Sequence, residues 1–209
     1  MLKELVASTS PNQAILGIGG SPRRNGNSDV LLRHAMEGGA RLGLPWESYQ
    51  LRDIQFQGCI GCELCRKDKI CTGLLDGMSM LYRPLLSSRG LVLVSPTHNY
   101  NITAWMKAFI DRLYCFYTFY DTIPRDWASN LSDQNRKAVI IAVCEQEHKK
   151  DMGFTLEAMR MPLEALGYEI VDEVAVFRIF HRGKVKEDQA LLDKVAKAGE
   201  SLARAISST

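Results

Sequence analysis

The sequence has no long apolar run, no strong excess of either charge and no segment of low complexity. No stretch approaches the roughly 18 consecutive apolar residues of a membrane-spanning helix, so we expect no membrane partner. Its 26 Lys and Arg against 24 Asp and Glu do not favour nucleic acid, because phosphate backbones are bound by clustered cations. Residues 1–13 contain no secretory apolar core, so we expect a cytoplasmic protein with reduced thiols.

What the sequence does contain is a regular alternation of strand and helix patterns. With 46% hydrophobic residues, residues 1–209 are expected to form a single domain with a full core. Strands are expected at Ala14–Gly19, Trp46–Leu51, Leu91–Val94, Lys137–Val143 and Glu169–Phe177. Helices are expected from Ser28 as N-cap, at Asp76–Leu86 with a kink or end at Pro84, at Thr103–Tyr117, at Phe154–Leu166 and at Val185–Ile206. Right-handed crossovers fold such a series into a doubly wound α/β domain, whose ligand site lies at the carboxyl ends of the strands.

The segment Gly20–Ser28, with the sequence GSPRRNGNS, joins the first strand to the first helix. Backbone N–H groups at such a helix start, together with hydroxyl, amide and arginine side chains, favour an anion. The chain has neither a G-x-x-x-x-G-K-[ST] run nor a G-x-G-x-x-G motif followed by an acidic residue, which argues against nucleoside triphosphates and dinucleotides at this loop. The alternative is an ordinary turn whose Asn and Gly residues serve local geometry.

Four of the six cysteines crowd into a polar loop expected at residues 55–75. Cys59, Cys62, Cys65 and Cys71 form a C-x2-C-x2-C-x5-C pattern, and two successive x2 spacings let one loop surround a 4Fe-4S cluster. A zinc site and thiols without a metal are the alternatives. Arg66, Lys67 and Lys69 would offset the negative charge of four thiolates.

Two segments resemble signatures of the NADPH-dependent FMN reductase superfamily: GSPRRNGNS at Gly20–Ser28 and SPTHNYNITAWMKAFIDR at Ser95–Arg112. With the cysteine pattern, the chain is similar to the iron–sulfur flavoprotein group within it. The resemblance implies a flavodoxin-like sheet of strand order 2-1-3-4-5 with helices on both faces, and FMN as cofactor. It assigns the FMN phosphate to Ser21, Arg23, Asn25, Asn27 and Ser28, the isoalloxazine to Pro96, Thr97, His98, Asn99, Tyr100 and Asn101, and the far side of the flavin to Cys144 and Glu145.

One position departs from that pattern, because His98 stands where many relatives have tyrosine. His98 could hydrogen-bond the flavin or a substrate, or it could be a structural donor in a polar loop.

The resemblance further implies a flavin-dependent oxidoreductase in which a cluster and FMN pass electrons between subunits. FMN exchanges one or two electrons and a 4Fe-4S cluster exchanges one at a time, so the pair links a donor such as ferredoxin to a small-molecule electron acceptor. The alternatives are an NAD(P)H-dependent FMN or quinone reductase without a cluster, and a thiol-based sensor. We also expect a homo-oligomer, dimer or tetramer, because Tyr114–Tyr120 carries more aromatic surface than one helix face can bury.

Overall fold

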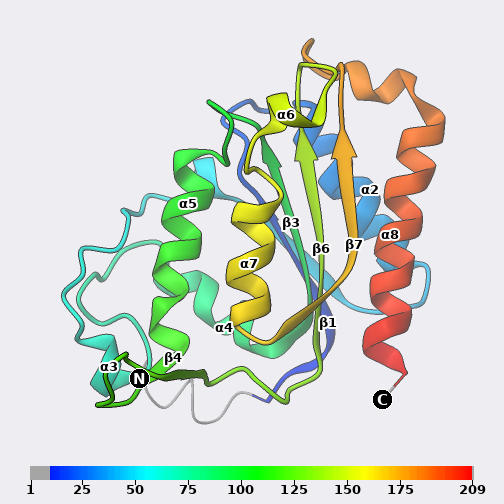
Figure 1. Cartoon of the computed structure of the whole chain (residues 1–209). Helices are drawn as coiled ribbons and strands as arrows, with labels where there is room; N and C mark the ends of the chain where they lie inside the picture. Colours follow the sequence, from blue (N-terminus) through cyan, green and yellow to red (C-terminus); the bar gives the residue numbers. More distant parts are fainter. Residues whose placement is uncertain (1–9, 209) are drawn as a thin grey trace.

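A computed structural model describes residues 10–208, so most of the N-terminal segment in which we expect no secretory signal lies outside the described residues. Five parallel strands form the central sheet in the order β2-β1-β3-β6-β7 (Figure 1). Their bounds are Asn12–Gly19 for β1, Trp46–Gln50 for β2, Ser88–Pro96 for β3, Arg136–Val143 for β6 and Tyr168–Val176 for β7. This confirms the predicted order 2-1-3-4-5.

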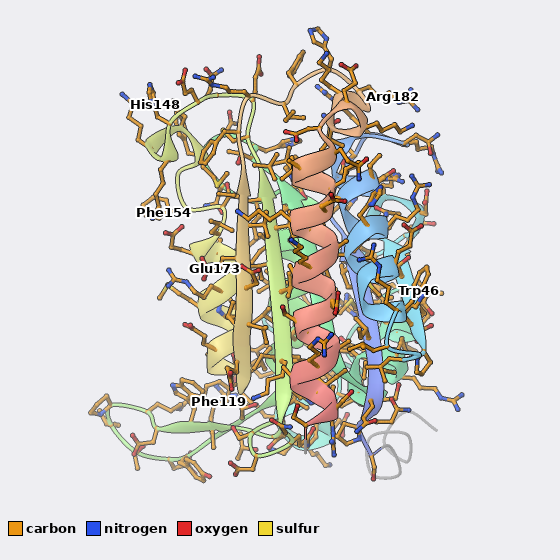
Figure 2. The ribbon with its side chains drawn as sticks, turned by 90° about the vertical axis from the view of Figure 1, so that its right-hand side faces the viewer. Trp46, Phe119, His148, Phe154, Glu173 and Arg182 are labelled. Carbon is orange, nitrogen blue, oxygen red and sulfur yellow. The ribbon has the colours of Figure 1, made fainter. Side chains whose placement is uncertain are left out.

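Helices cover both faces of the sheet. Helices α2 (Asn27–Ala40) and α8 (Gln189–Ser207) pack on one face, while α4 (Ser79–Ser87), α5 (Ala104–Asp111) and α7 (Glu157–Ala165) pack on the other. Figure 2 shows α8 lying along the sheet. In β3, Leu91 and Leu93 belong to one buried cluster, and Val92 and Val94 belong to the cluster on the opposite face. A continuous apolar run is therefore what a strand covered on both faces requires.

Helices α2 and α8 approach each other at glycines. A Cβ atom added at Gly199 would collide with the carbonyl oxygen of Ala35, and one added at Gly38 would collide with that of Ala196. Hydrogen in place of a methyl group therefore allows the two backbones to touch. Among residues 10–208, no helix combines the length and the apolarity needed to cross a bilayer.

The helix predicted at Thr103–Tyr117 is wrong in its second half. Helix α5 ends at Asp111, a 3-10 turn covers Arg112–Phe116, and β4 (Tyr117–Phe119) pairs antiparallel with β5 (Trp127–Ser129). The rings of Tyr117 and Trp127 meet edge to face at 5.1 Å. Consecutive aromatic residues suit a strand as well as a helix, and this cross-strand packing decides between the two.

Other boundaries also differ from the sequence expectations. Helix α4 continues through Pro84, because that residue is buried with its neighbours and packing outweighs one missing hydrogen bond. Gly26 is the N-cap of α2, so Ser28 lies inside the helix instead of capping it. The C-terminal helix begins at Gln189, after a 3-10 turn at Lys184–Glu187. The remaining short elements are a 3-10 turn at Leu51–Asp53, α3 at Cys65–Asp68 and α6 at Lys149–Met152.

Candidate functional site

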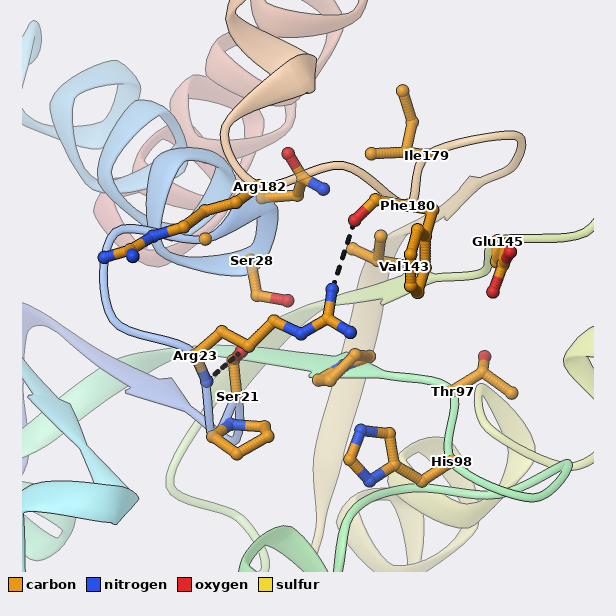
Figure 3. Close-up of a pocket in the computed structure, with 14 residues that line it drawn as sticks. Ser21, Arg23, Ser28, Thr97, His98, Val143, Glu145, Ile179, Phe180 and Arg182 are labelled. Atoms are coloured by element: carbon orange, nitrogen blue, oxygen red, sulfur yellow. Dashed lines mark hydrogen bonds between the residues drawn. The ribbon is translucent and has the colours of Figure 1, made fainter.

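A pocket of about 190 Å³ opens at the carboxyl ends of β1, β3 and β6 (Figure 3). Three loops that are far apart in the sequence meet there, as expected for the ligand site of a doubly wound sheet. Eight of the residues expected to bind the cofactor line it: Ser21, Arg23, Asn27, Ser28, Pro96, Thr97, His98 and Glu145.

The start of α2 supplies hydrogen-bond donors to this pocket. Its N-cap is Gly26, and no side chain of residues 10–208 caps the helix there. The hydroxyl of Ser28 points into the pocket (Figure 3). Arg23 extends across the pocket, donates to the carbonyl of Phe180 at 3.1 Å and lies 4.7 Å from the centre of the Phe180 ring. An uncapped helix start with hydroxyl and guanidinium groups beside it suits a phosphate.

Asn25 and Asn27 are held in roles other than pocket donors. The Asn27 amide donates to the carbonyl of His181 at 3.0 Å and accepts from the N–H of Val185 at 3.2 Å. Asn25 is exposed, has a φ of 53°, and donates its N–H to Asp29 at 2.7 Å. The side chain of Asn27 therefore fixes the segment after β7 against the start of α2.

Sequence reasoning missed the arginine that organises this loop. The Arg52 side chain is only 9% exposed and forms a two-bond pair with the Asp29 carboxylate at 2.8 and 2.9 Å. It also donates to the carbonyl oxygens of Ser21 at 3.0 Å and Arg23 at 3.3 Å. Nothing in the sequence around Arg52 distinguishes it from a surface arginine, because its partners come from another part of the chain.

The second loop is a tight turn at the rim of the pocket. His98 and Asn101 exchange backbone hydrogen bonds of 2.8 and 3.0 Å, and Asn99 and Tyr100 between them have φ values of 46° and 62°. Two left-handed central residues define a type I′ turn. The carbonyl of Tyr100 accepts from the N–H of Phe154 at 2.8 Å, which anchors the turn. Asn99, Tyr100 and Asn101 are exposed, while the ring of His98 faces the pocket (Figure 3) and forms no hydrogen bond with another described residue.

The third side of the pocket comes from the ends of β6 and β7. Glu145 lines it, but Cys144 is buried at 2% exposure and is held by backbone bonds to Val176 and Ile179. Pro22 and Gly26 also line the pocket, within the predicted anion loop Gly20–Ser28, and the lining residues that sequence reasoning missed are Val143, Ile179, Phe180 and Arg182. Ile179, Phe180 and Arg182 follow β7, where the composition of the loop alone gave no signal for a site.

The chemistry of this pocket fits FMN. Uncapped backbone donors, the Ser21 and Ser28 side chains and two arginines suit the phosphate, while Phe180 and Pro96 offer apolar surface to a ring. A Cβ atom at Gly26 would lie 3.2 Å from the carbonyl oxygen of Arg23, so the backbone of the loop packs closely at the position where a phosphate would lie.

The four clustered cysteines line a second, small pocket of about 20 Å³, whose wall also includes Ile60, Leu74 and Tyr114. Cys59 and Cys62 are exposed, and Cys65 and Cys71 are buried. Gly61 has a φ of 67°, so the chain bends there in a way that favours glycine. Burial raises the pKa of the Cys65 thiol, and the other three thiols raise it further.

A buried ion pair closes the loop that carries these cysteines. The Arg112 side chain is fully buried and contacts the Asp76 carboxylate at 2.8 and 3.1 Å. It also donates to the carbonyls of Gln57 and Leu74, one on each side of the cysteine run. Burial acts to raise the pKa of Asp76, but hydrogen bonds from Arg112 and from the N–H of Gln57 lower it, and the net shift is downward.

The four thiols are a donor set that suits a 4Fe-4S cluster. Within residues 10–208, no three His, Cys, Asp or Glu side chains are arranged to hold one metal ion. In a 4Fe-4S cluster each cysteine binds its own iron, so four thiols around one apolar-walled pocket are the donors that it needs.

The two pockets lie at opposite ends of the molecule. Arg66 of α3 stacks on Phe119 at 5.2 Å, next to the cysteines, whereas Arg182 lines the pocket at the carboxyl ends of the strands. Figure 2 labels Phe119 at one end of the molecule and Arg182 at the other, and Figure 1 shows α3 beside β4 at the end away from α6.

A doubly wound sheet of this strand order, with an anion pocket at the switch point, defines a flavodoxin-like protein. The model of the NADPH-dependent FMN reductase family matches residues 14–176. The chain belongs to this family, which confirms the resemblance of the two sequence signatures.

Known proteins with related sequences carry the name iron–sulfur flavoprotein. One from Methanocaldococcus jannaschii is 32% identical over 98 residues, which are 47% of this chain and 50% of that protein. One from Archaeoglobus fulgidus is 35% identical over 98 residues, 47% of this chain and 44% of that protein. The matched part thus spans about half the length of these relatives.

A solved structure shows the same fold. The FMN-dependent NADH-azoreductase of Bacillus anthracis, crystallised with FMN, superposes with a TM-score of 0.68 at 19% identity, over 91% of this chain and 99% of that one.

Proposed function

We propose that this protein is a flavin-dependent oxidoreductase that binds FMN at the carboxyl ends of its strands and a 4Fe-4S cluster at Cys59, Cys62, Cys65 and Cys71. The observation that carries the proposal is the uncapped start of α2, facing a pocket lined by hydroxyl groups and arginines. Family membership supports the flavin, and the names of the related proteins support the cluster. When bound, FMN supplies one- and two-electron chemistry and the cluster supplies one-electron transfer.

The protein residues would bind and orient rather than react. Ser21, Ser28 and Arg23 would hold the phosphate, and Pro96, Thr97 and His98 would flank the isoalloxazine. His98 would donate or accept a hydrogen bond at the ring edge. The exposed Asn99, Tyr100 and Asn101 would limit access from solvent, and Glu145 and the backbone of Cys144 would close the other side.

Titration of the purified apoprotein with FMN tests the first half of the proposal. We expect quenching of flavin fluorescence with about one site per chain, and Ser28→Ala should weaken binding. Ser87→Ala is the control, because Ser87 ends α4 on the sheet face away from α2 and lines no part of the pocket. A protein that leaves a desalting column without flavin would contradict the proposal.

Iron and sulfide analysis after anaerobic purification tests the second half. We expect four irons per chain in the wild type and a large loss in Cys65→Ser. Cys144→Ser serves as the control, because Cys144 is buried outside the cysteine pocket. Negligible iron in the wild type would favour a reductase without a cluster, in which NAD(P)H reduces the flavin directly; rapid flavin bleaching by NADPH in a stopped-flow instrument would support that function.

We further propose a homo-oligomer in the cytoplasm, with ferredoxin as donor and a small molecule as acceptor. Two pockets at opposite ends of one chain support the oligomer, because a second copy could bring a cysteine pocket near a flavin pocket. Tyr120 and Trp127 are 49% exposed each, so the β4–β5 hairpin still offers aromatic surface. Sedimentation should give a dimer or larger, and a stable monomer would refute this.

A further inference from the structure

We propose that Arg52 is a positioning residue that makes this pocket select a phosphorylated flavin over riboflavin. The inference rests on the proposed binding of FMN and goes beyond it, because Arg52 lines no part of the pocket. It acts through the loop that the phosphate would touch.

Arg52 binds several of the negatively polarised oxygen atoms of that loop. One guanidinium holds the carboxylate of Asp29 and the carbonyl oxygens of Ser21 and Arg23. Asp29 sits in the first turn of α2, where the helix dipole attracts negative charge. A phosphate at the same helix start would be repelled by a free carboxylate, and by carbonyl oxygens that turned toward it. The pairing with Arg52 removes both sources of repulsion.

Arg52 also sets the direction of one donor. The carbonyl of Arg23 and the N–H of Arg24 belong to one planar peptide unit and point in opposite directions. Because the carbonyl is tied to Arg52, the N–H of Arg24 must point away from Arg52. The side chains of Arg52 and Asp29 are only 9% and 15% exposed, so water replaces these contacts poorly.

The two terminal nitrogens of the Arg52 guanidinium bind the two oxygens of Asp29, a pairing that a single ammonium cannot form. Nη1 of Arg52 lies within hydrogen-bond distance of the Ser21 and Arg23 carbonyls, of one Asp29 oxygen and of the amide oxygen of Gln50 at 3.2 Å, and Nη2 binds the second Asp29 oxygen. A lysine ammonium has one nitrogen, so it would keep a positive charge near the loop but would lose the paired contact with both Asp29 oxygens.

The experiment compares the dissociation constants of FMN and riboflavin for the wild type and five variants. We expect Arg52→Gln to weaken FMN binding about 10- to 100-fold, the loss of one to two charge-assisted hydrogen bonds, and riboflavin binding about threefold or less. Arg52→Lys keeps the charge but not the paired contact with Asp29, so it should weaken FMN binding less than Arg52→Gln does. Arg33→Gln is the matched control, because Arg33 lies on α2 and is 58% exposed, and it should change neither constant.

The double variant Arg52→Gln/Asp29→Asn separates positioning from a merely structural role. Removing the unpaired carboxylate should restore part of the FMN affinity, whereas a structural role would leave the double variant at least as weak as the single one. Equal weakening of FMN and riboflavin binding by Arg52→Gln, or no recovery of FMN affinity in the double variant, would overturn the inference. Wild-type protein that binds neither flavin would instead overturn the proposed function, so the two failures are distinguishable. Circular dichroism of each variant verifies folding, and Asp29→Asn alone, with little loss of FMN affinity expected, gives a test if Arg52→Gln does not fold.

Discussion

The buried pair of Arg112 and Asp76 should make a large contribution to stability, and Asp76→Asn tests it. The asparagine keeps the shape of the side chain but removes its charge, so the fully buried guanidinium of Arg112 loses its counter-ion. Breaking a buried pair by removing one partner costs roughly 3–5 kcal/mol. Because the Asp76 side chain is 17% exposed and Arg112 keeps the carbonyls of Gln57 and Leu74, we expect about 3 kcal/mol, at the low end of that range.

Urea denaturation followed by circular dichroism measures this loss. With an m-value of about 2–3 kcal/mol/M, the midpoint should fall by about 1 M. Asp111→Asn is the matched control, because Asp111 pairs with Lys107 on an exposed helix face, with side chains 41% and 59% exposed. That exposed pair should contribute no more than about 0.5 kcal/mol. Equal midpoints for the two variants would refute the reasoning.

The pH dependence of the same pair has a definite sign. The pKa of Asp76 is lower in the folded protein than in the unfolded chain, so its contribution is fully present above the unfolded value of about 3.9. The contribution is lost as the pH falls through the folded pKa. The gap in stability between wild type and Asp76→Asn should therefore narrow below about pH 4. A gap that stays constant down to pH 2 would contradict this assignment.

Two further substitutions probe the packing and the site. Gly199→Ala should lower the free energy of unfolding by about 1–3 kcal/mol, because its methyl group would collide with the carbonyl of Ala35. Gly58→Ala is the control, because its methyl group would lie 3.9 Å from its nearest neighbour, and it should be nearly neutral. Urea denaturation measures both. Thr103→Val removes the N-cap of α5 and the hydrogen bond of 2.8 Å to the carbonyl of Gly20, so we expect a loss of about 1–2 kcal/mol and weaker FMN binding in a fluorescence titration; unchanged stability and affinity would show that the cap is dispensable.

The central sheet could be predicted because its signal is local. The strands are continuous apolar runs, since alternate residues such as Leu93 and Val94 are buried on opposite faces. The β4–β5 hairpin could not be predicted in this way. The apolar spacing from Trp105 to Phe116 favours a helix throughout, whereas the helix ends at Asp111 and Tyr117 packs on Trp127 across the hairpin.

The sequence likewise predicts some of the residues that line the pocket and not others. Strand order predicts that the loops after β1, β3 and β6 form the site, and Ser28 and His98 in these loops do line the pocket. Phe180 and Arg182 were missed because they follow β7, outside the three loops that strand order assigns to the site, and the hydrogen bond from Asn27 to the His181 carbonyl holds their segment against the start of α2. The dependence of the loop on Arg52 was also hidden, because an arginine after an edge strand normally faces water.

Both candidate cofactor sites use a buried arginine to hold a polar loop, which bears on how the protein folds. Arg52 satisfies the carbonyls of the anion loop and Arg112 satisfies those on both sides of the cysteines. A loop without regular structure leaves carbonyl oxygens that must find donors when they are buried. These four carbonyl oxygens therefore have protein donors, while the N–H groups at the start of α2 keep no side-chain partner among residues 10–208 and stay available to a phosphate. The arginines would hold part of each loop before a cofactor binds, which reduces the ordering entropy that cofactor binding has to offset.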